Sequence, residues 1–215
     1  MLWMNLDPPE MASVAPILTG IRVLRVLRVE TMWGSKNRTM LVGTIALVVG
    51  LVAPAGAHAS TVTVANGNTI RVLESGNETN GVSVSYEGGM DLYTVSDAAA
   101  SLTPSGTCVA VDANTATCPG AGITRVSVDS GDRDDSIALD DQTIPLTITQ
   151  ILDGGPANDV VDGANAAGTL RGGSGNDLIT GRGTLSGESG NDALIGSPEA
   201  DNLRGGGGGD GFGRR

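Results

Sequence analysis

The sequence from residue 154 onward repeats one nine-residue pattern, in Gly154-Gly-Pro-Ala-Asn-Asp-Val-Val-Asp162, Gly172-Gly-Ser-Gly-Asn-Asp-Leu-Ile-Thr180, Gly187-Glu-Ser-Gly-Asn-Asp-Ala-Leu-Ile195 and Gly205-Gly-Gly-Gly-Gly-Asp-Gly-Phe-Gly213. Each copy fits Gly-Gly-x-Gly-x-Asp-x-U-x, where U is a large apolar residue. Glycine permits positive φ angles and leaves carbonyl groups accessible. The Asp adds a hard anionic oxygen, and x-U-x is typical of a short strand with one inward side chain. The repeat therefore predicts tight turns that alternate with short strands.

The apolar position alone tests this prediction without the glycines. It recurs in steps of 9, 9, 9, 6, 9, 9 and 9 residues, at Leu152, Val161, Leu170, Ile179, Leu185, Leu194, Leu203 and Phe212. A helix would need apolar residues three and four apart and fewer glycines. The simple alternative is a disordered Gly-rich tail, but a random tail would not keep this register.

These residues resemble the RTX (repeats in toxin) family of hemolysin-type calcium-binding repeats. The resemblance is specific over residues 154–213 and weaker over 129–153. It implies an all-β fold with a parallel β-roll, in which calcium ions lie between consecutive turns of the same side. It also implies which residues serve the metal, and these are the turn residues Gly154, Gly155, Asp159, Gly172, Gly173, Gly175, Asp177, Gly187, Gly190, Asp192, Gly205, Gly206, Gly208 and Asp210.

In the family's roll each nonapeptide makes half a turn of the coil, so turns on one side are two repeats apart. The resemblance therefore places Asp159, Asp177, Asp192 and Asp210 in one row, with room for three calcium ions. The turns that begin at Gly163, Gly181 and Gly196 fall on the other side. These turns lack the Asp except for Asp201, because Gly168 replaces one and a three-residue deletion removes another. We expect calcium on one side only.

Departures from the pattern mark weaker turns. Ala157 replaces the third glycine of one repeat and Glu188 the second glycine of another, and each would cost about 1 to 2 kcal/mol if its backbone is left-handed. Ser130-Gly-Asp-Arg-Asp-Asp135 resembles a degenerate opening turn. Its Asp135 would extend the row and admit a fourth ion, although residues 142–150 interrupt the register.

The N-terminal region has the pattern of a secretory signal. Lys36 and Arg38 precede the apolar run of residues 40–53, and Ala57-His-Ala59 offers small residues to a signal peptidase. We expect a signal helix over 32–59, cleaved after Ala59 or after Ala57, and a secreted, extracellular product. Residues 1–31 are interpreted as a misassigned upstream start; the alternative is a cationic amphipathic segment that contacts membranes.

The exported chain from Ser60 is strongly acidic. It holds 8 Arg and no Lys against 21 Asp and Glu, which gives a formal net charge of −13. Nucleic-acid binding needs a basic face and is not expected.

Residues 60–128 predict a small β segment that precedes the roll over 129–215. Runs such as 61–65, 81–86 and 123–128 alternate apolar with small polar residues, and Gly-containing pairs separate them. Cys108 and Cys118 are the only cysteines, and in an exported chain a hairpin disulfide is the expected state.

Catalysis is not expected. The only histidine, His58, lies in the signal, so the exported chain has no Ser-His-Asp, Cys-His or His-Glu-x-x-His chemistry. Paired carboxylates could hydrolyse glycosides, but the acids cluster in cation-type turns without an aromatic sugar platform.

The sequence predicts a secreted calcium-binding protein with a structural or adhesive role at a cell surface or matrix. The alternative is a fragment of a larger RTX toxin or secreted enzyme, because no capping segment follows Phe212. An uncovered last strand would also be an edge at which a second copy could pair.

Overall fold

The computed structural model describes residues 59–215. The signal helix, its basic flank and the upstream extension are predictions for residues that lie outside this range. The described residues form an all-β fold without a helix, as expected. Accordingly, none of these residues forms a helix that could cross a membrane.

Fifteen strands make up one sheet. The first seven are β1 (Ala59–Ala65), β2 (Thr69–Leu73), β3 (Gly81–Glu87), β4 (Leu92–Asp97), β5 (Ser101–Ser105), β6 (Val109–Ala110) and β7 (Thr115–Pro119). The other eight are β8 (Arg125–Asp129), β9 (Ser136–Leu139), β10 (Thr149–Pro156), β11 (Val160–Ser174), β12 (Leu178–Ser189), β13 (Ala193–Gly196), β14 (Asn202–Gly207) and β15 (Gly211–Arg214).

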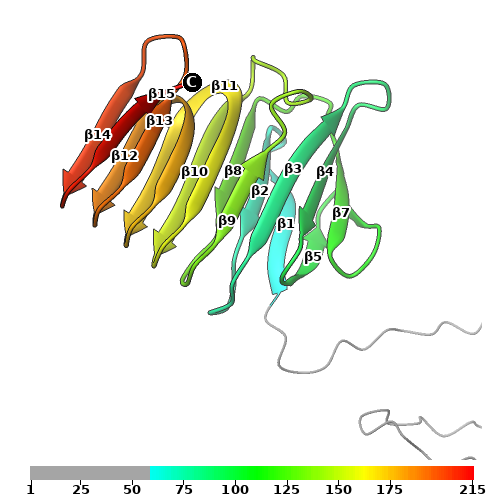
Figure 1. Ribbon diagram of the computed structural model, residues 1–215. Helices are drawn as coiled ribbons and strands as arrows, with labels where there is room; N and C mark the ends of the chain where they lie inside the picture. Colours follow the sequence, from blue (N-terminus) through cyan, green and yellow to red (C-terminus); the bar gives the residue numbers. More distant parts are fainter. Residues whose placement is uncertain (1–58) are drawn as a thin grey trace, which may run out of the picture. The chain divides into compact units, whose positions relative to one another are not determined.

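All strand pairs from β8 onward are parallel, and their register follows the repeat (Figure 1). Leu152 pairs with Leu170, and Leu170 pairs with Leu185. On the other face Val161 pairs with Ile179, which pairs with Leu194. Each apolar position therefore lies beside the one two repeats along the chain, so alternate repeats form alternate faces. The long strands β11 and β12 contribute to both faces.

The N-terminal strands continue the same two faces. Parallel pairing joins β2 to β8 on one face and β3 to β9 on the other. Antiparallel partners then flank this end, with β1 beside β2 and β4 beside β3. The boundary expected at residue 128 falls within β8, which pairs with β2 on one side and β10 on the other (Figure 1).

The repeat side chains form the C-terminal part of the core, which continues into the N-terminal strands through residues such as Ile70 and Tyr93. Six of the eight predicted positions, from Leu152 to Leu194, are at most 1 % exposed. Leu203 is partly buried, and Phe212 in the last strand is 59 % exposed. The prediction of inward apolar residues is thus confirmed for all but the final rung, where no further strand of the chain covers Phe212.

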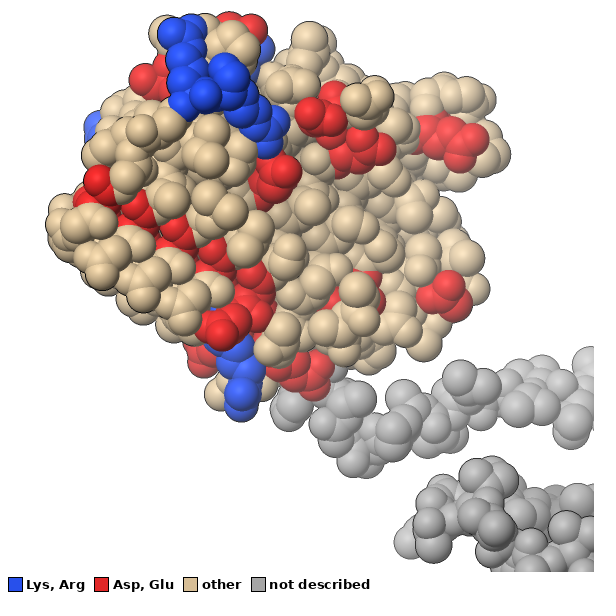
Figure 2. All heavy atoms as spheres, viewed as in Figure 1, with Lys and Arg blue, Asp and Glu red and all other residues tan. Residues whose placement is uncertain are grey.

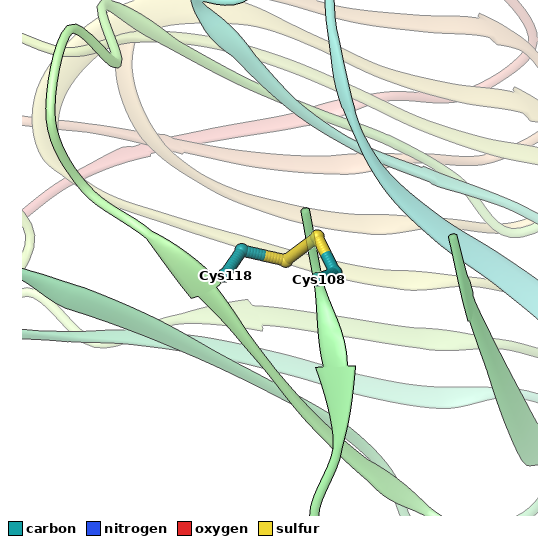
Figure 3. Close-up of a disulfide and its surroundings, with 2 residues drawn as sticks. All are labelled: Cys108 and Cys118. Atoms are coloured by element: carbon teal, nitrogen blue, oxygen red, sulfur yellow. A yellow bond between two sulfur atoms is a disulfide. The ribbon is translucent and has the colours of Figure 1, made fainter. Parts of the chain in front are cut away.

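The predicted disulfide joins Cys108 to Cys118 (Figure 3). It ties the segment before β6 to β7, which pairs antiparallel with β6. Both cysteines are buried. The hairpin disulfide is therefore confirmed, and it stabilises the end of the molecule opposite the Gly-rich repeats.

Candidate metal site

The six-residue turns between the two faces share one backbone conformation. We number each turn from 1 to 6, so that Gly154 is position 1 and Asp159 is position 6. Positions 2 and 4 have positive φ in five consecutive turns, at Gly131, Arg133, Gly155, Ala157, Gly173, Gly175, Glu188, Gly190, Gly206 and Gly208. Ala157 (φ 91°) and Glu188 (φ 75°) have positive φ, so the condition under which their side chains cost free energy is met, and Arg133 (φ 88°) is a third non-glycine residue with positive φ.

We call the parallel strands β8 to β15 and their connecting turns the coil. The position-6 aspartates form a continuous row along one edge of this coil. Each accepts, through Oδ1, the backbone N–H of the position-6 residue in the preceding turn. The N···Oδ1 distances are 2.8 Å from Asp135 to Asp159, 2.8 Å from Asp159 to Asp177, 2.9 Å from Asp177 to Asp192 and 3.1 Å from Asp192 to Asp210. We call these five residues the aspartate row. It contains the four residues predicted to align, together with Asp135, so the interruption at 142–150 does not break the row.

The second oxygen of these carboxylates has no partner. The Oδ2 atoms of Asp135, Asp159, Asp177 and Asp192 are buried and accept no hydrogen bond. The four residues are between 1 % and 4 % exposed, whereas Asp210 in the last turn is only partly buried. A buried carboxylate oxygen without a donor costs free energy. This row of unpaired anionic oxygens therefore calls for a proton or a cation.

Backbone carbonyl oxygens point into the same intervals between turns. The position-4 carbonyls of Ala157, Gly175 and Gly190 each face the position-4 α-carbon of the following turn, where an added Cβ would clash with them. Among the described residues these three oxygens accept no hydrogen bond. The donor set between successive turns is thus carboxylate and carbonyl oxygen, which suits a hard cation such as calcium.

The first glycine of each repeat makes room for its own aspartate. A Cβ at Gly154, Gly172, Gly187 or Gly205 would clash with the Oδ2 atom of the Asp five residues later. Position 1 therefore has to be small wherever the aspartate folds back over its own turn. All the glycines predicted to serve the metal lie in these turns, where they can offer a metal only backbone carbonyl oxygens.

Burial and mutual repulsion raise the pKa values of three members of the aspartate row, Asp135, Asp159 and Asp177. Loss of solvent is the largest cause, and the neighbouring aspartate adds to it, while the hydrogen bond from the preceding backbone N–H acts in the opposite direction. The pKa of Asp135 rises to about 7 and that of Asp159 to about 6, and the pKa of Asp177 is also raised. When no cation is bound, these three carboxylates therefore stay protonated at pH values well above the usual titration range of aspartate.

A second row of hydrogen bonds lies outside the first, at position 5. Asn158 donates its backbone N–H to Asp134 Oδ1, Asn176 donates to Asn158 Oδ1, and Asn191 donates to Asn176 Oδ1, over 2.8 to 2.9 Å. Position 5 has no predicted role in the sequence, although the Asn-Asp pair recurs there. This row stacks the turns without a cation.

The opposite side of the coil has an amide in place of the carboxylates, and the Oε1 atom of this amide, in Gln150, is itself buried without a hydrogen-bond partner. Gln150 is fully buried where an Asp would stand, and its amide Nε2 donates to the carbonyl oxygens of Ala164 (2.8 Å) and Ala166. Gln150 pairs in register with Gly168, and Gly168 pairs with Gly183. A side-chain amide thus serves turn carbonyls that would otherwise need a cation.

Asp201, the only aspartate in the corresponding turns of that side, is already saturated. Its Oδ1 accepts the N–H of Gly183 (2.6 Å), and its Oδ2 accepts the N–H (2.7 Å) and the hydroxyl (2.9 Å) of Ser197. Although burial alone would raise its pKa, these bonds and Arg182 lower it. Asp201 therefore has no free oxygen to offer a metal.

No cluster of three or more His, Cys, Asp or Glu side chains that could hold a metal occurs within residues 59–215. A metal between two turns of the aspartate row would have the carboxylates of those turns and their backbone carbonyls as ligands. Figure 2 shows a line of acidic residues crossing the C-terminal part of the coil. The site is thus extended along an edge instead of being enclosed in a pocket.

Comparisons of the chain with protein-family models, with curated proteins and with solved structures return no match. The fold and site define the chain as an all-β protein with a buried row of aspartates. Any closer assignment depends on the repeat itself.

Proposed function

We propose that this chain is a secreted calcium-binding protein whose parallel coil is a β-roll of the RTX type, stabilised by calcium ions between the turns of the aspartate row. The observation that carries the proposal is the set of four buried Oδ2 atoms without a donor. Three ions would lie between the turns from Asp159 to Asp210, and Asp135 adds a fourth interval.

Electrostatics support a bound cation. Neighbouring strands are about 4.8 Å apart, so stacked carboxylates repel by about 1 kcal/mol per pair in water and by more in a partly dry site. A divalent ion in each interval would reverse this repulsion. Binding free energy would then become folding free energy.

Calcium fits better than magnesium. Calcium accepts six to eight oxygen ligands in flexible geometry, whereas magnesium demands a tight octahedron. The turns offer backbone carbonyls at irregular angles with few carboxylates. We therefore expect magnesium to substitute poorly.

Export supports the same function because millimolar calcium is found outside cells. The disulfide is typical of an oxidising compartment. Ala59 begins β1 and pairs with Ser101; cleavage after Ala57 would keep the whole strand, and cleavage after Ala59 would shorten it by one residue. A non-catalytic role at a cell surface or matrix fits the acidic, histidine-free exported chain.

Calcium binding by the purified protein tests the proposal. Isothermal titration calorimetry at pH 7.5 should detect binding to the unaltered protein and a large loss in a triple variant, Asp159→Asn, Asp177→Asn and Asp192→Asn. The control Asp201→Asn should bind as the unaltered protein does, because Asp201 is saturated. Absence of binding at 10 mM calcium would overturn the proposal.

A further inference from the structure

The row of turns continues one step beyond the repeats, into residues 74–80. Asn80 stands in the position-6 column, because β3 pairs with β9 in register and Ser136 pairs with both Gly81 and Val160. Its backbone N–H donates to Asp135 Oδ1 over 2.6 Å, in the same way as each aspartate donates to the next. Residues 74–80 therefore act as a sixth turn, although they contain no repeat motif.

This sixth turn places a carboxylate where the repeat turns place a carbonyl. In three turns the α-carbon at position 2 faces the position-2 carbonyl oxygen of the preceding turn. These pairs are Gly155 with Gly131, Gly173 with Gly155, and Gly206 with Glu188. For Gly131 the facing atom is Oε2 of Glu74. The Glu74 side chain thus substitutes for a backbone oxygen of the missing turn.

Two hydrogen bonds hold Glu74 in this position. The carboxylate oxygen Oε1 accepts the backbone N–H of Glu78 over 3.0 Å, and the backbone N–H of Glu74 donates to Asp129 O over 3.1 Å. The other oxygen, Oε2, accepts no hydrogen bond from any residue in the described part of the chain. The oxygen that faces Gly131 is therefore free to take a ligand.

Asp135 supplies a second, independent indication of a ligand. It is 4 % exposed, its Oδ1 is directed to the N–H of Asn80, and its Oδ2 is buried without a partner. The carboxylate therefore reaches into the interval between residues 74–80 and the turn 130–135. Asn80, 1 % exposed, closes the interior of this interval and donates its amide to Ser130 O over 2.9 Å.

We propose that a further calcium ion binds between residues 74–80 and the turn 130–135, held by the carboxylates of Glu74 and Asp135. This inference rests on the proposed function, since it extends the same row. Two carboxylates serve this site, and one of them is not part of any repeat. The ion would join the N-terminal strands to the coil and would cap the row at its start.

Native mass spectrometry of the purified protein in calcium acetate counts the bound ions. Glu74→Gln keeps the shape of the side chain and removes its charge, so it should bind one calcium ion fewer than the unaltered protein. The matched control Glu78→Gln should bind the full number, because only the backbone of Glu78 contacts Glu74. Asp135→Asn should lose two ions, since it borders two intervals.

The outcomes separate the two proposals. A protein that binds no calcium overturns the proposed function itself. Equal counts for the unaltered protein and Glu74→Gln overturn only this inference. If Glu74→Gln does not fold, crystals of the unaltered protein grown with calcium give the answer: an ion in contact with Glu74 supports the inference, and ions at the other intervals alone overturn it.

Discussion

At the scale of single residues, the backbone of the turns decides which side chains are tolerated. Ala157 has φ 91° and Gly175, at the same position of the next turn, has φ 135°. A Cβ on Gly175 would clash with the Ala157 carbonyl oxygen. Both positions therefore have positive φ, but the glycine lies in a region of φ that brings its α-carbon too close to the preceding turn for a side chain.

Replacing Ala157 by Gly should stabilise the folded protein by about 0.5 to 1 kcal/mol, because relief of the left-handed strain outweighs the added freedom of the unfolded chain. Gly175→Ala should destabilise it by at least about 2 kcal/mol. Urea denaturation in saturating calcium measures both. Gly207→Ala is the control, since an added Cβ there meets no atom within 4 Å; equal effects at Gly175 and Gly207 would refute the turn geometry.

Single aspartates should differ according to the number of intervals they border. Asp159, Asp177 and Asp192 lie inside the row, so replacing any of them by Ala should raise the calcium concentration needed for folding by about tenfold or more, since ligand charge sets affinity over decades. Asp210→Ala should have a smaller effect because it ends the row. Asp201→Ala should change the calcium midpoint little, because the Asp201 carboxylate already bonds Gly183 and Ser197. The one-sided site fails if Asp201→Ala shifts the calcium midpoint as far as Asp177→Ala.

At the scale of elements, the aspartate row should respond to protons as well as to calcium. The folded pKa values of Asp135 and Asp159, about 7 and about 6, exceed the ordinary value of 3.8. The folded state therefore binds more protons than the unfolded state between about pH 4 and pH 7, so stability without calcium falls as pH rises through this window.

With a chelator present, lowering the pH from 7.5 to 5 should shift the folding equilibrium of the calcium-free protein towards the folded state, so that β-structure increases. In saturating calcium the same change should weaken the protein, because protons compete with the ion. Circular dichroism in chelator measures the first trend, and urea denaturation in saturating calcium measures the second. A calcium-free protein with less β-structure at pH 5 than at pH 7.5 would show that the row is not charged and buried as described.

The opposite side of the coil should depend on Gln150 and not on calcium. Gln150→Ala removes the amide that serves the carbonyls of Ala164 and Ala166. Leaving buried carbonyls unpaired costs about 1 to 3 kcal/mol each. The loss of stability in thermal denaturation should be similar at the lowest calcium concentration that folds the protein and at 10 mM calcium. A variant rescued by calcium would instead indicate that an ion can replace the amide.

The strands and turns of residues 151–213 could be predicted because a nine-residue period fixes both inward side chains and turn glycines. Asn80, Glu74 and Gln150 could not, because their roles arise from the pairing of β2 with β8, β3 with β9 and β10 with β11, between segments without a shared motif. Position 5 of the turns was open to prediction from the repeated Asn-Asp pair. Such a prediction requires knowing that the position-5 side chain accepts a hydrogen bond from the backbone of the next turn.

At the scale of the whole molecule, one sheet joins the N-terminal strands to the coil. Stacking of parallel strands therefore transmits stability along its length. The disulfide stabilises one end, and the last strand, with Phe212 exposed, forms the other. Between them the stability of the coil depends on the charge state of the aspartate row, since four of its carboxylates are buried.

Circular dichroism of the purified protein at pH 7.5, recorded during titration from chelator to 10 mM calcium, tests this dependence most directly. We predict a largely disordered spectrum in chelator, β-structure that appears at about 0.1 to 1 mM calcium, and little change with the same concentrations of magnesium. A β spectrum that is unchanged between chelator and 10 mM calcium would contradict the account.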